Sequence, residues 1–453
     1  MFKELLIQFN GFFTLYLIFP FILLLGLYLS WRLKLIQVFK LKMSIVHLFK
    51  KDEKDEGTLT HFQAVASVLA ANFGTGNISG MAIALATGGP GSLVWMWVMA
   101  FFGSAIQFAS CLLGVKYRQK IQGEYMGGPM YYLREGLGLK KIAVLFSICV
   151  ILVSFTLGSF VQVNSMTLPL KQIGISPWLV GVTIALLSAL VILGGVQRIA
   201  KASSAIVPIM AFFYLLAAFV VLALHGEHLF AAFKLMFQSA FSGMSLGGGV
   251  LGFTIMKALT TGFDRGILAT DAGTGAVPIL QSGAKTKHPV IDGVVSIFSP
   301  FLVMIVCTTT ALVLIVTGAF VSDFRSTDMV VYAFQKGLGD MIGLFVVITA
   351  LFLFGYTTLL AWASCLQQSV SFVFGSRFVR PSLLLYVLFV PVGALLDAGI
   401  VWVLADIFLT AMMFFNLIGV TALSKEVIEE SRIYFAKQRS QHLLINDKKT
   451  ISS

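Results

Sequence analysis

Residues 71–80 read Ala-Asn-Phe-Gly-Thr-Gly-Asn-Ile-Ser-Gly and lie in the middle of a hydrophobic segment that is long enough to span a bilayer. The stretch combines glycines with polar side chains where a membrane helix would otherwise be apolar. Every backbone N–H and C=O in lipid needs a partner, so a helix is interrupted at membrane depth only where protein or a wet cavity surrounds it. The stretch therefore predicts a broken helix beside a binding site.

A second hydrophobic segment contains a similar interruption at residues 242–249, Ser-Gly-Met-Ser-Leu-Gly-Gly-Gly, five predicted spans after the first. Interrupted helices in corresponding positions of two halves are the best sequence pointer to the substrate and ion site of a secondary transporter. The two segments together predict a transporter with its binding site where the helices are broken.

The composition is that of a membrane protein. Hydrophobic residues make up 58% of the 453 residues, charged residues make up 11%, and the mean hydropathy is +0.93. A net charge of +12 would suit nucleic-acid binding only on a water-soluble basic face, so no nucleic-acid partner is expected. The cysteines each stand alone in an apolar segment, which favours small buried side chains over a disulfide or zinc framework. They are Cys111, Cys149, Cys307 and Cys365.

The hydropathy pattern predicts eleven membrane spans of about 20 residues each. The spans run at 11–32, 61–86, 91–117, 141–168, 177–195, 203–224, 233–261, 290–318, 340–373, 381–396 and 400–423. Assigning the loops alternately puts 26 of the 32 Lys and Arg residues on one side of the membrane. Because an excess of positive charge marks the cytoplasmic side, the N-terminus is predicted outside and the C-terminus in the cytoplasm.

The polar residues of the first interruption are predicted to bind a ligand. Close helix packing through small residues would explain Gly76 and Gly80, which are four residues apart. Packing does not explain Asn72, Thr75 and Asn77, because polar side chains at membrane depth are costly and usually functional. An unwound segment also offers free carbonyls to a cation and free N–H groups to a carboxylate.

Two other spans carry polar side chains for which a ligand contact and a structural role both remain open. Thr357 and Thr358 lie about one helical turn before Trp362, but a threonine hydroxyl can also bond back to its own helix. Gln162 lies near the middle of the fourth span, where an interhelical hydrogen bond is an equal alternative.

Residues 243–247 match the Gly-x-Ser-x-Gly pattern of serine hydrolases, with Ser245 in the place of the nucleophile. In α/β-hydrolases that pattern needs a preceding strand and a following helix, which this span does not offer. An intramembrane hydrolase would need a histidine base at membrane depth. All six histidines fall in predicted loops or at span ends, so the chain is not expected to be an enzyme, and a hydrolase is only a remote alternative.

Ionisable side chains are nearly missing from the predicted spans. Asp264 and Asp271 fall in a predicted cytoplasmic loop, and Asp397 and Asp406 lie near the predicted outer interface. Proton-coupled carriers commonly titrate a buried acid or histidine, whereas neutral oxygens suffice to hold sodium. The sequence therefore favours sodium as the coupling ion.

Eight motifs, in order from about residue 60 to 423, resemble those of the alanine/glycine:cation symporters. They are 72–80, 88–91, 95–97, 127–132, 265–267, 271–275, 307–312 and 405–408. The resemblance implies an all-α fold of the leucine-transporter type, in which two inverted repeats of five helices follow one extra helix. The repeats would occupy 61–224 and 233–424 of a core at 61–424, after an N-terminal helix and linker at 1–60 and before a cytoplasmic tail at 425–453.

The resemblance also implies roles for particular residues. The interruption would receive the carboxylate of an amino acid, and other side chains would line the pocket; the substrate-binding set is Asn72, Thr75, Gly76, Asn77, Gln162, Met244 and Trp362. A sodium ion would be held by two backbone carbonyls and two hydroxyls, those of Ala70, Phe73, Thr357 and Thr358.

The function expected from these observations is sodium-coupled import of small neutral amino acids, alanine or glycine, across a bacterial inner membrane. The expected partners are the amino acid, the sodium ion and the lipid bilayer, and no enzyme cofactor is expected. A proton-coupled or exchange carrier of the same fold is the alternative.

Overall fold

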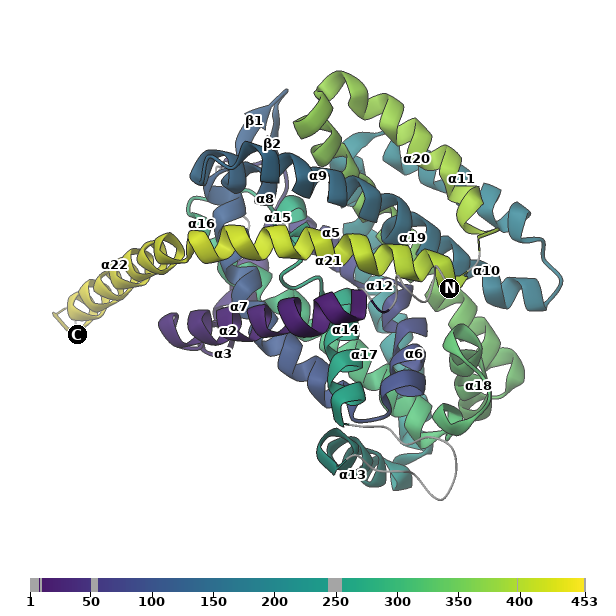
Figure 1. Cartoon of the computed structure of the whole chain (residues 1–453). Helices are drawn as coiled ribbons and strands as arrows, with labels where there is room; N and C mark the ends of the chain where they lie inside the picture. The colour runs from purple at the N-terminus through teal and green to yellow at the C-terminus, as the bar shows by residue number, and fades with distance from the viewer. Residues whose placement is uncertain (1–7, 9, 50–55, 243–254, 397, 452–453) are drawn as a thin grey trace.

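The computed structural model describes residue 8 and residues 10–49, 56–242, 255–396 and 398–451. These residues form a bundle of helices with one short two-stranded hairpin (Figure 1). Eight helices of the described chain are long and apolar enough to cross a membrane. The chain is therefore a multi-pass membrane protein, as its composition predicts.

The first half of the chain begins with an N-terminal helix and a short amphipathic segment, and continues into the bundle. Its helices and strands are a π-helical turn (Thr14–Ile18), α2 (Phe19–Arg32), α3 (Ile36–Phe39), α4 (Leu41–Leu48), α5 (His61–Asn72), a 3₁₀ turn (Thr75–Asn77), α6 (Ser79–Gly88), α7 (Ser92–Lys116), β1 (Gln119–Ile121), β2 (Glu124–Met126), α8 (Pro129–Tyr131), a π-helical turn (Tyr132–Gly136), α9 (Lys140–Phe155), a π-helical turn (Thr156–Val161), α10 (Gln162–Gln172), α11 (Pro177–Ile192) and α12 (Gly195–Leu224).

The second half of the chain completes the bundle and ends in a long polar helix. Its elements are α13 (Gly226–Ser242), α14 (Ile255–Thr270), α15 (Ala276–Gln281), α16 (Pro289–Ser296), α17 (Phe298–Val316), a 3₁₀ turn (Ala319–Val321), α18 (Ser326–Leu338), α19 (Asp340–Phe374), a 3₁₀ turn (Ser376–Phe378), α20 (Val379–Gly393), α21 (Ala398–Ala422) and α22 (Ser424–Ile451).

The first predicted interruption is confirmed. Helix α5 begins with a capping box in which Thr60 and Gln63 exchange side-chain and backbone hydrogen bonds of 3.0 and 3.1 Å. It ends at Asn72 because Phe73 leaves helical geometry, with ψ at 61°. The helix resumes as α6 at Ser79 after the 3₁₀ turn. The predicted span 61–86 is thus two half-helices.

The second interruption of the described chain lies between α14 and α15, which the sequence pattern did not indicate. The predicted break at 242–249 falls, except for Ser242, outside the described residues. Between α14 and α15, Asp271, Gly273 and Gly275 adopt positive φ angles of 50°, 90° and 93°. This is the left-handed region that glycine enters without steric cost. The glycines of this segment therefore permit the helix to break.

The prediction that Asp264 and Asp271 lie in a cytoplasmic loop is wrong. Helix α14 continues to Thr270, nine residues past the predicted end of its span, and Asp271 is only 2% exposed. Asp264 lines the same cavity as Asp406, which was predicted to lie near the outer interface, so the two cannot be on opposite sides of the membrane. The polar residues of α14 lowered its hydropathy, although most of the helix is buried against its neighbours.

Two long helices organise the packing of the bundle. Helix α7 packs against α14, α16 and α2, and helix α19 packs against α9, α12, α18 and α5. The side chains between them form a large cluster of buried apolar residues. This packing fixes α5 and α14, the helices that end at the two interruptions, between the long helices.

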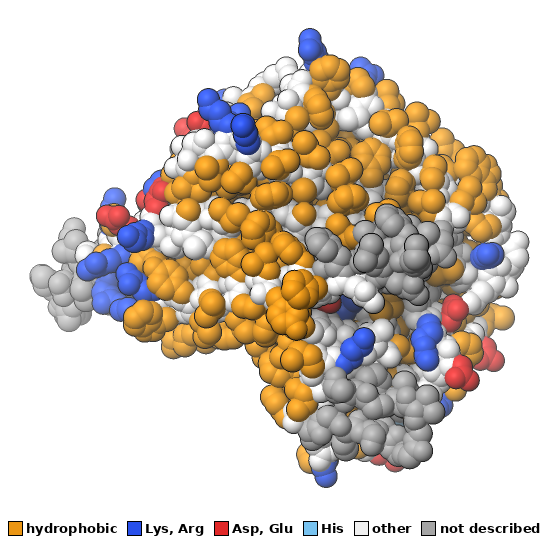
Figure 2. Space-filling model, viewed as in Figure 1, with side chains coloured by type: hydrophobic (Ala, Val, Ile, Leu, Met, Phe, Trp, Pro, Cys, Tyr) orange, Lys and Arg blue, Asp and Glu red, His pale blue; other side chains and the backbone are white. Residues whose placement is uncertain are grey.

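The surface of the bundle is mainly hydrophobic. Figure 2 shows hydrophobic side chains over most of the visible face, with Lys, Arg, Asp and Glu gathered toward its ends. Large exposed apolar residues lie on several helices of this surface, among them Leu186, Phe212 and Phe219. An apolar belt between charged ends is what a bilayer requires of the protein it surrounds.

The segment after the last predicted span forms a long helix. Helix α22 extends from Ser424 to Ile451, over nearly the whole segment predicted as a cytoplasmic tail. It is tied to the end of α7 because the Lys116 Nζ lies 3.0 Å from Glu426 and 2.8 Å from Glu430. The Tyr117 hydroxyl donates to Glu426 at 2.9 Å. The start of the tail is therefore part of the folded body.

Candidate functional site

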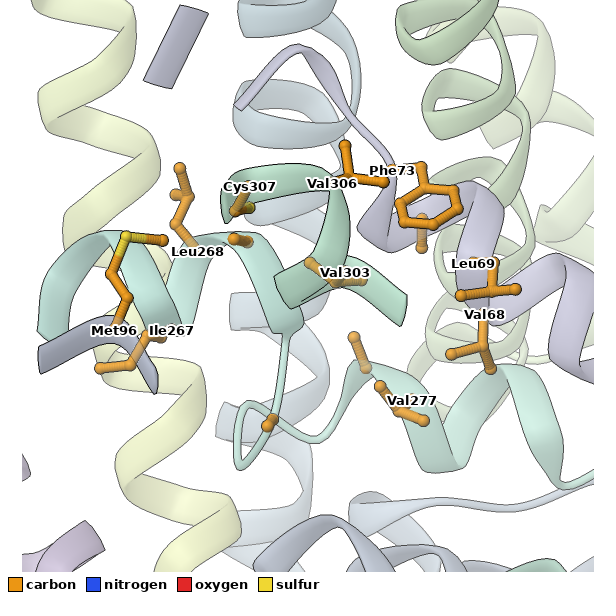
Figure 3. Packing of buried hydrophobic residues seen from close by; sticks show 14 of the residues in the cluster. Val68, Leu69, Phe73, Met96, Ile267, Leu268, Val277, Val303, Val306 and Cys307 are labelled. Atoms are coloured by element: carbon orange, nitrogen blue, oxygen red, sulfur yellow. The ribbon is translucent and has the colours of Figure 1, made fainter. Parts of the chain in front are cut away.

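The two interruptions of the helices meet in the centre of the bundle. The Asn72 side-chain amide, at the end of α5, donates a 2.9 Å hydrogen bond to the carbonyl of Thr270, at the end of α14. Figure 3 shows Ile267 and Leu268 on α14 and Val277 on α15, with the second interruption between them. Elements 198 residues apart in sequence are thus joined where both are unwound.

A small buried cavity lies between the interruptions. Its volume is about 10 Å³, which is about the space of one water molecule. An amino acid therefore enters only if the surrounding side chains move. The cavity is lined by Ala71, Asn72, Gly74, Gly76, Asn77, Leu157, Gln162, Leu268, Asp271, Thr358 and Trp362.

Gln162 supplies hydrogen-bond partners to the first interruption. Its Oε1 accepts from the Thr75 backbone N–H at 2.9 Å and from the Thr75 hydroxyl at 3.0 Å. Its Nε2 donates to the Leu157 carbonyl at 2.9 Å, within the π-helical turn that precedes α10. The side-chain oxygen of Gln162 therefore accepts a hydrogen bond from an N–H group that has no partner within a helix, because the helix is broken there.

Asn72 and Asn77 hold the unwound segment together. Asn77 donates its side-chain amide to the Asn72 carbonyl at 2.7 Å, and its Oδ1 lies 3.4 Å from the thiol of Cys307 on α17. The Oδ1 of Asn72 is buried and has no hydrogen-bond partner among the described residues. Because an unpaired buried acceptor costs about 1–3 kcal/mol, this oxygen is suited to accept a hydrogen bond from a ligand.

The predicted cation ligands are partly brought together. The Thr358 hydroxyl on α19 donates to the Ala70 carbonyl at 2.8 Å and to the Phe354 carbonyl at 2.9 Å. Ala70 needs a partner because α5 ends before the N–H of residue 74 could reach it. The Thr357 hydroxyl instead bonds to its own helix, at 2.9 Å from the Leu353 carbonyl. The structure thus links Thr358, and not Thr357, directly to α5.

Phe73, the other predicted carbonyl ligand, is buried at the start of the interruption. Its ring centroid lies 5.8 Å from that of Phe354 on α19, and its N–H donates to the Leu69 carbonyl at 2.7 Å. Within the described ranges no group of three or more His, Cys, Asp or Glu residues is arranged to hold a metal. The four predicted ligands would offer a cation carbonyl and hydroxyl oxygens.

Trp362 forms an apolar wall of the cavity. Its side chain is fully buried, and it packs directly on Gly158 in the π-helical turn before α10. A Cβ atom at position 158 would lie 2.4 Å from the Trp362 Cβ, so the close approach requires glycine. On the opposite side, a Cβ at Gly76 would lie 3.3 Å from Leu268. Met244, the other predicted pocket residue, lies outside the described residues.

Side chains from α21 and the second interruption itself hold that segment in place. Asn416 donates its side-chain amide to the Gly273 carbonyl at 2.7 Å, and its Oδ1 accepts from the Tyr132 hydroxyl. The Thr274 hydroxyl donates to the Asp271 carbonyl at 2.8 Å. The segment between α14 and α15 is therefore fixed although it is not helical.

Asp271 and Leu268 line the cavity but were not predicted as site residues. Asp271 is buried, and its Oδ1 has no hydrogen-bond partner in the described part of the chain. The signal that could have found it is the Asp-x-Gly-x-Gly pattern at 271–275, in which two glycines permit a helix break directly after an acid. The predicted spans therefore left out a buried carboxylate that lines the cavity.

Two interrupted helices that face one buried polar cavity are typical of a secondary transporter. The chain belongs to the sodium:alanine symporter family, whose sequence pattern matches residues 1–448. This membership confirms the resemblance seen in the sequence. It makes the protein an amino-acid:cation symporter and not an enzyme.

Relatives of known and unknown activity cover nearly the whole chain. A transporter of uncharacterized function from Haemophilus influenzae is 41% identical over 92% of this chain and 92% of its own length. The sodium/alanine symporter AgcS of Methanococcus maripaludis is 39% identical over 90% of this chain and 92% of its own. A probable sodium/glutamine symporter, GlnT of Bacillus subtilis, is 31% identical over 92% of this chain and 87% of its own length.

Solved structures of distant transporters share the fold. A Na⁺-coupled sialic acid symporter in a substrate-bound outward-open state superposes with a TM-score of 0.55 at 13% identity, over 81% of each chain. The manganese transporter of Eremococcus coleocola also gives a TM-score of 0.55, at 15% identity, over 88% of this chain and 94% of that one. At such low identity the similarity concerns the fold alone.

Replacing Gln162 with Ala tests whether its amide stabilises the interruption. The change leaves the Thr75 N–H and hydroxyl without their buried acceptor, so the free energy of unfolding is expected to fall by about 1–3 kcal/mol. The thermal midpoint of the purified protein in detergent measures this loss. Gln172→Ala is the matched control, because Gln172 is an exposed glutamine on the same helix. A Gln162→Ala variant as stable as the control would contradict the assignment.

Proposed function

We propose that this protein imports small neutral amino acids, alanine or glycine, together with sodium across a bacterial inner membrane by alternating access. The observation that carries the proposal is the contact between the two interruptions, where Asn72 reaches the carbonyl of Thr270 beside the cavity. Unwound segments expose backbone donors and acceptors in one place. Such a place suits a ligand with both a negative and a positive group.

The substrate carboxylate would bind the N–H groups of the first interruption. Gln162 Oε1 already accepts from the Thr75 N–H and hydroxyl, so an oxygen is favoured at that position. This position also lies before α6, whose N-terminus carries a partial positive charge. In the proposed binding step a carboxylate oxygen replaces the Gln162 oxygen, and Gly76 lets the ligand approach the backbone.

The substrate ammonium would lie between Asn72 and Asp271. Both residues line the cavity, and each has a buried Oδ1 without a hydrogen-bond partner in the described chain. An ammonium group has three donors and would satisfy both oxygens. Asn77 would brace the segment through its bond to the Asn72 carbonyl. The substrate-binding set proposed from the sequence is thus extended by Asp271.

The size of the substrate would be limited by Trp362 and Leu268. Both side chains line a cavity that holds about one water molecule in this conformation. A substrate with a hydrogen or a methyl side chain requires the smallest displacement of these walls. Met244 remains proposed as a further wall residue from the sequence resemblance alone.

Sodium would bind where α5 ends beside α19. The Ala70 carbonyl and the Thr358 hydroxyl are already 2.8 Å apart, and both have lone pairs that a cation could share. Phe73 would contribute its carbonyl, and Thr357 would have to rotate away from its own helix to contribute its hydroxyl. All four residues are buried, so a cation there would be withdrawn from bulk water.

The architecture proposed for this mechanism is the leucine-transporter type, with eleven membrane helices in two inverted repeats of five after an extra N-terminal helix. Support comes from the position of the interruptions. The pair α5 and α6 would open the first repeat at 61–224, and the pair α14 and α15 would be its counterpart in the second repeat at 233–424, after the end of α13. Residues 1–60 and 425–453 would flank this core.

The orientation proposed places the N-terminus outside and the C-terminus in the cytoplasm. The hairpin of β1 and β2 and helix α22 would then face the cytoplasm, and α13 and α18 would face outside (Figure 1). Most Lys and Arg residues would still lie on the cytoplasmic side. Arg265 falls in the predicted cytoplasmic loop that contains Asp264, but in this orientation it would lie on the outer side, because its Nη2 is 3.6 Å from the Oδ2 of Asp406.

A proton-coupled carrier of the same fold is the second candidate. Two observations favour it: the buried Asp271 beside the cavity, and a buried pair of His61 and Asp292 with 3.5 Å between Nδ1 and Oδ1. Buried ionisable groups in membrane proteins commonly serve proton movement. The sodium prediction below distinguishes the two candidates.

Removing the hydroxyl of Thr358 is expected to lower the affinity for sodium more than removing the hydroxyl of Thr357. Removing a group that contacts a charged partner costs about 1.5–3 kcal/mol of binding free energy. Thr358→Val should therefore raise the half-saturating sodium concentration roughly ten- to a hundredfold. Thr357→Val is the matched control with a smaller expected effect. The measurement is alanine uptake into proteoliposomes at graded sodium concentrations. Uptake that persists in choline and follows a pH gradient would contradict sodium coupling.

Trp362→Ala is expected to admit larger neutral amino acids and to weaken alanine binding. One methylene in an apolar pocket is worth about 1–3 kcal/mol, so the space left by an indole should accept leucine. Competition by leucine against labelled alanine uptake measures the change. Trp178→Ala is the control, because Trp178 is 53% exposed on the surface of the bundle. If leucine stays excluded and alanine affinity stays intact, Trp362 does not set the size limit.

A further inference from the structure

A second polar cavity lies between the N-terminal helical segment, α14 and α21, at the end of the bundle proposed to face outside. Its volume is about 280 Å³, and its lining includes the charged side chains of Lys257, Asp264, Arg265 and Asp406. The hydroxyl-bearing Thr14 and Thr260 also line it. Because roughly 10–15 Å³ of such space holds one water, the cavity admits a molecule as small as alanine.

Arg265 lines this cavity, and part of its hydrogen-bonding capacity is unused. Its Nη2 lies 3.6 Å from the Oδ2 of Asp406, which is longer than a hydrogen bond. Its Nη1 is buried and has no hydrogen-bond partner in the described ranges. The guanidinium carbon lies 5.5 Å from the centre of the Trp402 ring, which restrains its position. A guanidinium presents paired donors that match a carboxylate.

Two carboxylates lie beside Arg265, so the cavity offers negative charges for an ammonium group and a positive charge for a carboxylate, as a zwitterionic amino acid requires. Asp264 and Asp406 both line the cavity and would attract an ammonium group, while Arg265 attracts the carboxylate. Side chains of Arg265 and Asp406 are 16% and 28% exposed, so the charges are partly withdrawn from water and poorly screened. A neutral solute or a simple ion would use only part of this set.

A narrow second cavity leads from the charged cluster toward the central site. It measures about 20 Å³ and is lined by Asp264, Asp406, Met413 and Leu268 among others. Leu268 also lines the cavity between the two helix interruptions. The side chain of Leu268 therefore separates the charged cluster from the proposed substrate site.

We propose that Asp264, Arg265 and Asp406 form an outer binding site for a zwitterionic amino acid, from which the substrate passes Leu268 to reach the central site. The inference rests on the proposed function, because it takes the same amino acid as the ligand. The outer site binds alanine more weakly than the central one, since its groups are better hydrated.

The test is the number of labelled alanine molecules bound to the purified full-length protein at saturating sodium. The wild-type protein is expected to bind two per chain, one tightly and one weakly. Arg265→Gln should weaken the second by tenfold or more and leave the affinity for the first within twofold. Asp271→Asn, which removes the negative charge proposed to hold the ammonium group at the central site, should weaken the first. Lys234→Gln, which removes an exposed positive charge on α13, is the matched control and should change neither.

Two further outcomes keep the test decisive. If Arg265→Gln does not fold, Arg265→Lys retains the charge without the paired donors and should still weaken only the second molecule. A wild-type stoichiometry of one, or a second molecule that survives both substitutions, would overturn the outer site and leave the central site standing. A wild-type protein that binds no alanine would instead refute the proposed substrate.

Discussion

The site depends on one constraint: backbone groups inside a membrane protein need hydrogen-bond partners, so a helix is broken there only where other groups replace its own bonds. The described part of this protein contains two such breaks beside one cavity, and neighbouring helices supply the replacement hydrogen bonds. Gln162 accepts from the Thr75 N–H, Thr358 donates to the Ala70 carbonyl, and Asn416 donates to the Gly273 carbonyl. The interruptions are therefore fixed features of the fold and not local unfolding.

The same bonds explain how the site could take up its ligands. A carboxylate presents the kind of oxygen that Gln162 presents to Thr75. A cation could bind between the oxygen atoms of Thr358 and Ala70 if the hydroxyl rotated its proton away from the Ala70 carbonyl. When the ligands bind, they would replace these hydrogen-bond partners, so few buried polar groups would be left without a partner. The small volume between the interruptions means that this exchange has to be accompanied by movement of Trp362 or Leu268.

The sequence predicted the first interruption and much of its surroundings, because glycines and polar side chains are costly in the middle of an apolar span unless the helix is broken there. It also identified Gln162, Thr358 and Trp362, which the structure brings to the same cavity. It missed the interruption between α14 and α15. The charged residues of α14 lowered its hydropathy, so this part of the chain was predicted to be a loop, although tertiary packing buries most of the helix. The position of Asp271 follows from this packing and could not be obtained from hydropathy.

The most direct test of the account is the thermodynamic coupling between alanine and sodium in the purified protein. If both ligands bind at the interruption of α5 and α6, alanine affinity should rise steeply with sodium concentration, and sodium affinity should rise by the same factor with alanine. Asn77→Ala, which removes the side chain that bonds to the Asn72 carbonyl, should abolish much of this coupling in a folded protein. Alanine affinity that is equal in sodium and in choline would contradict the account.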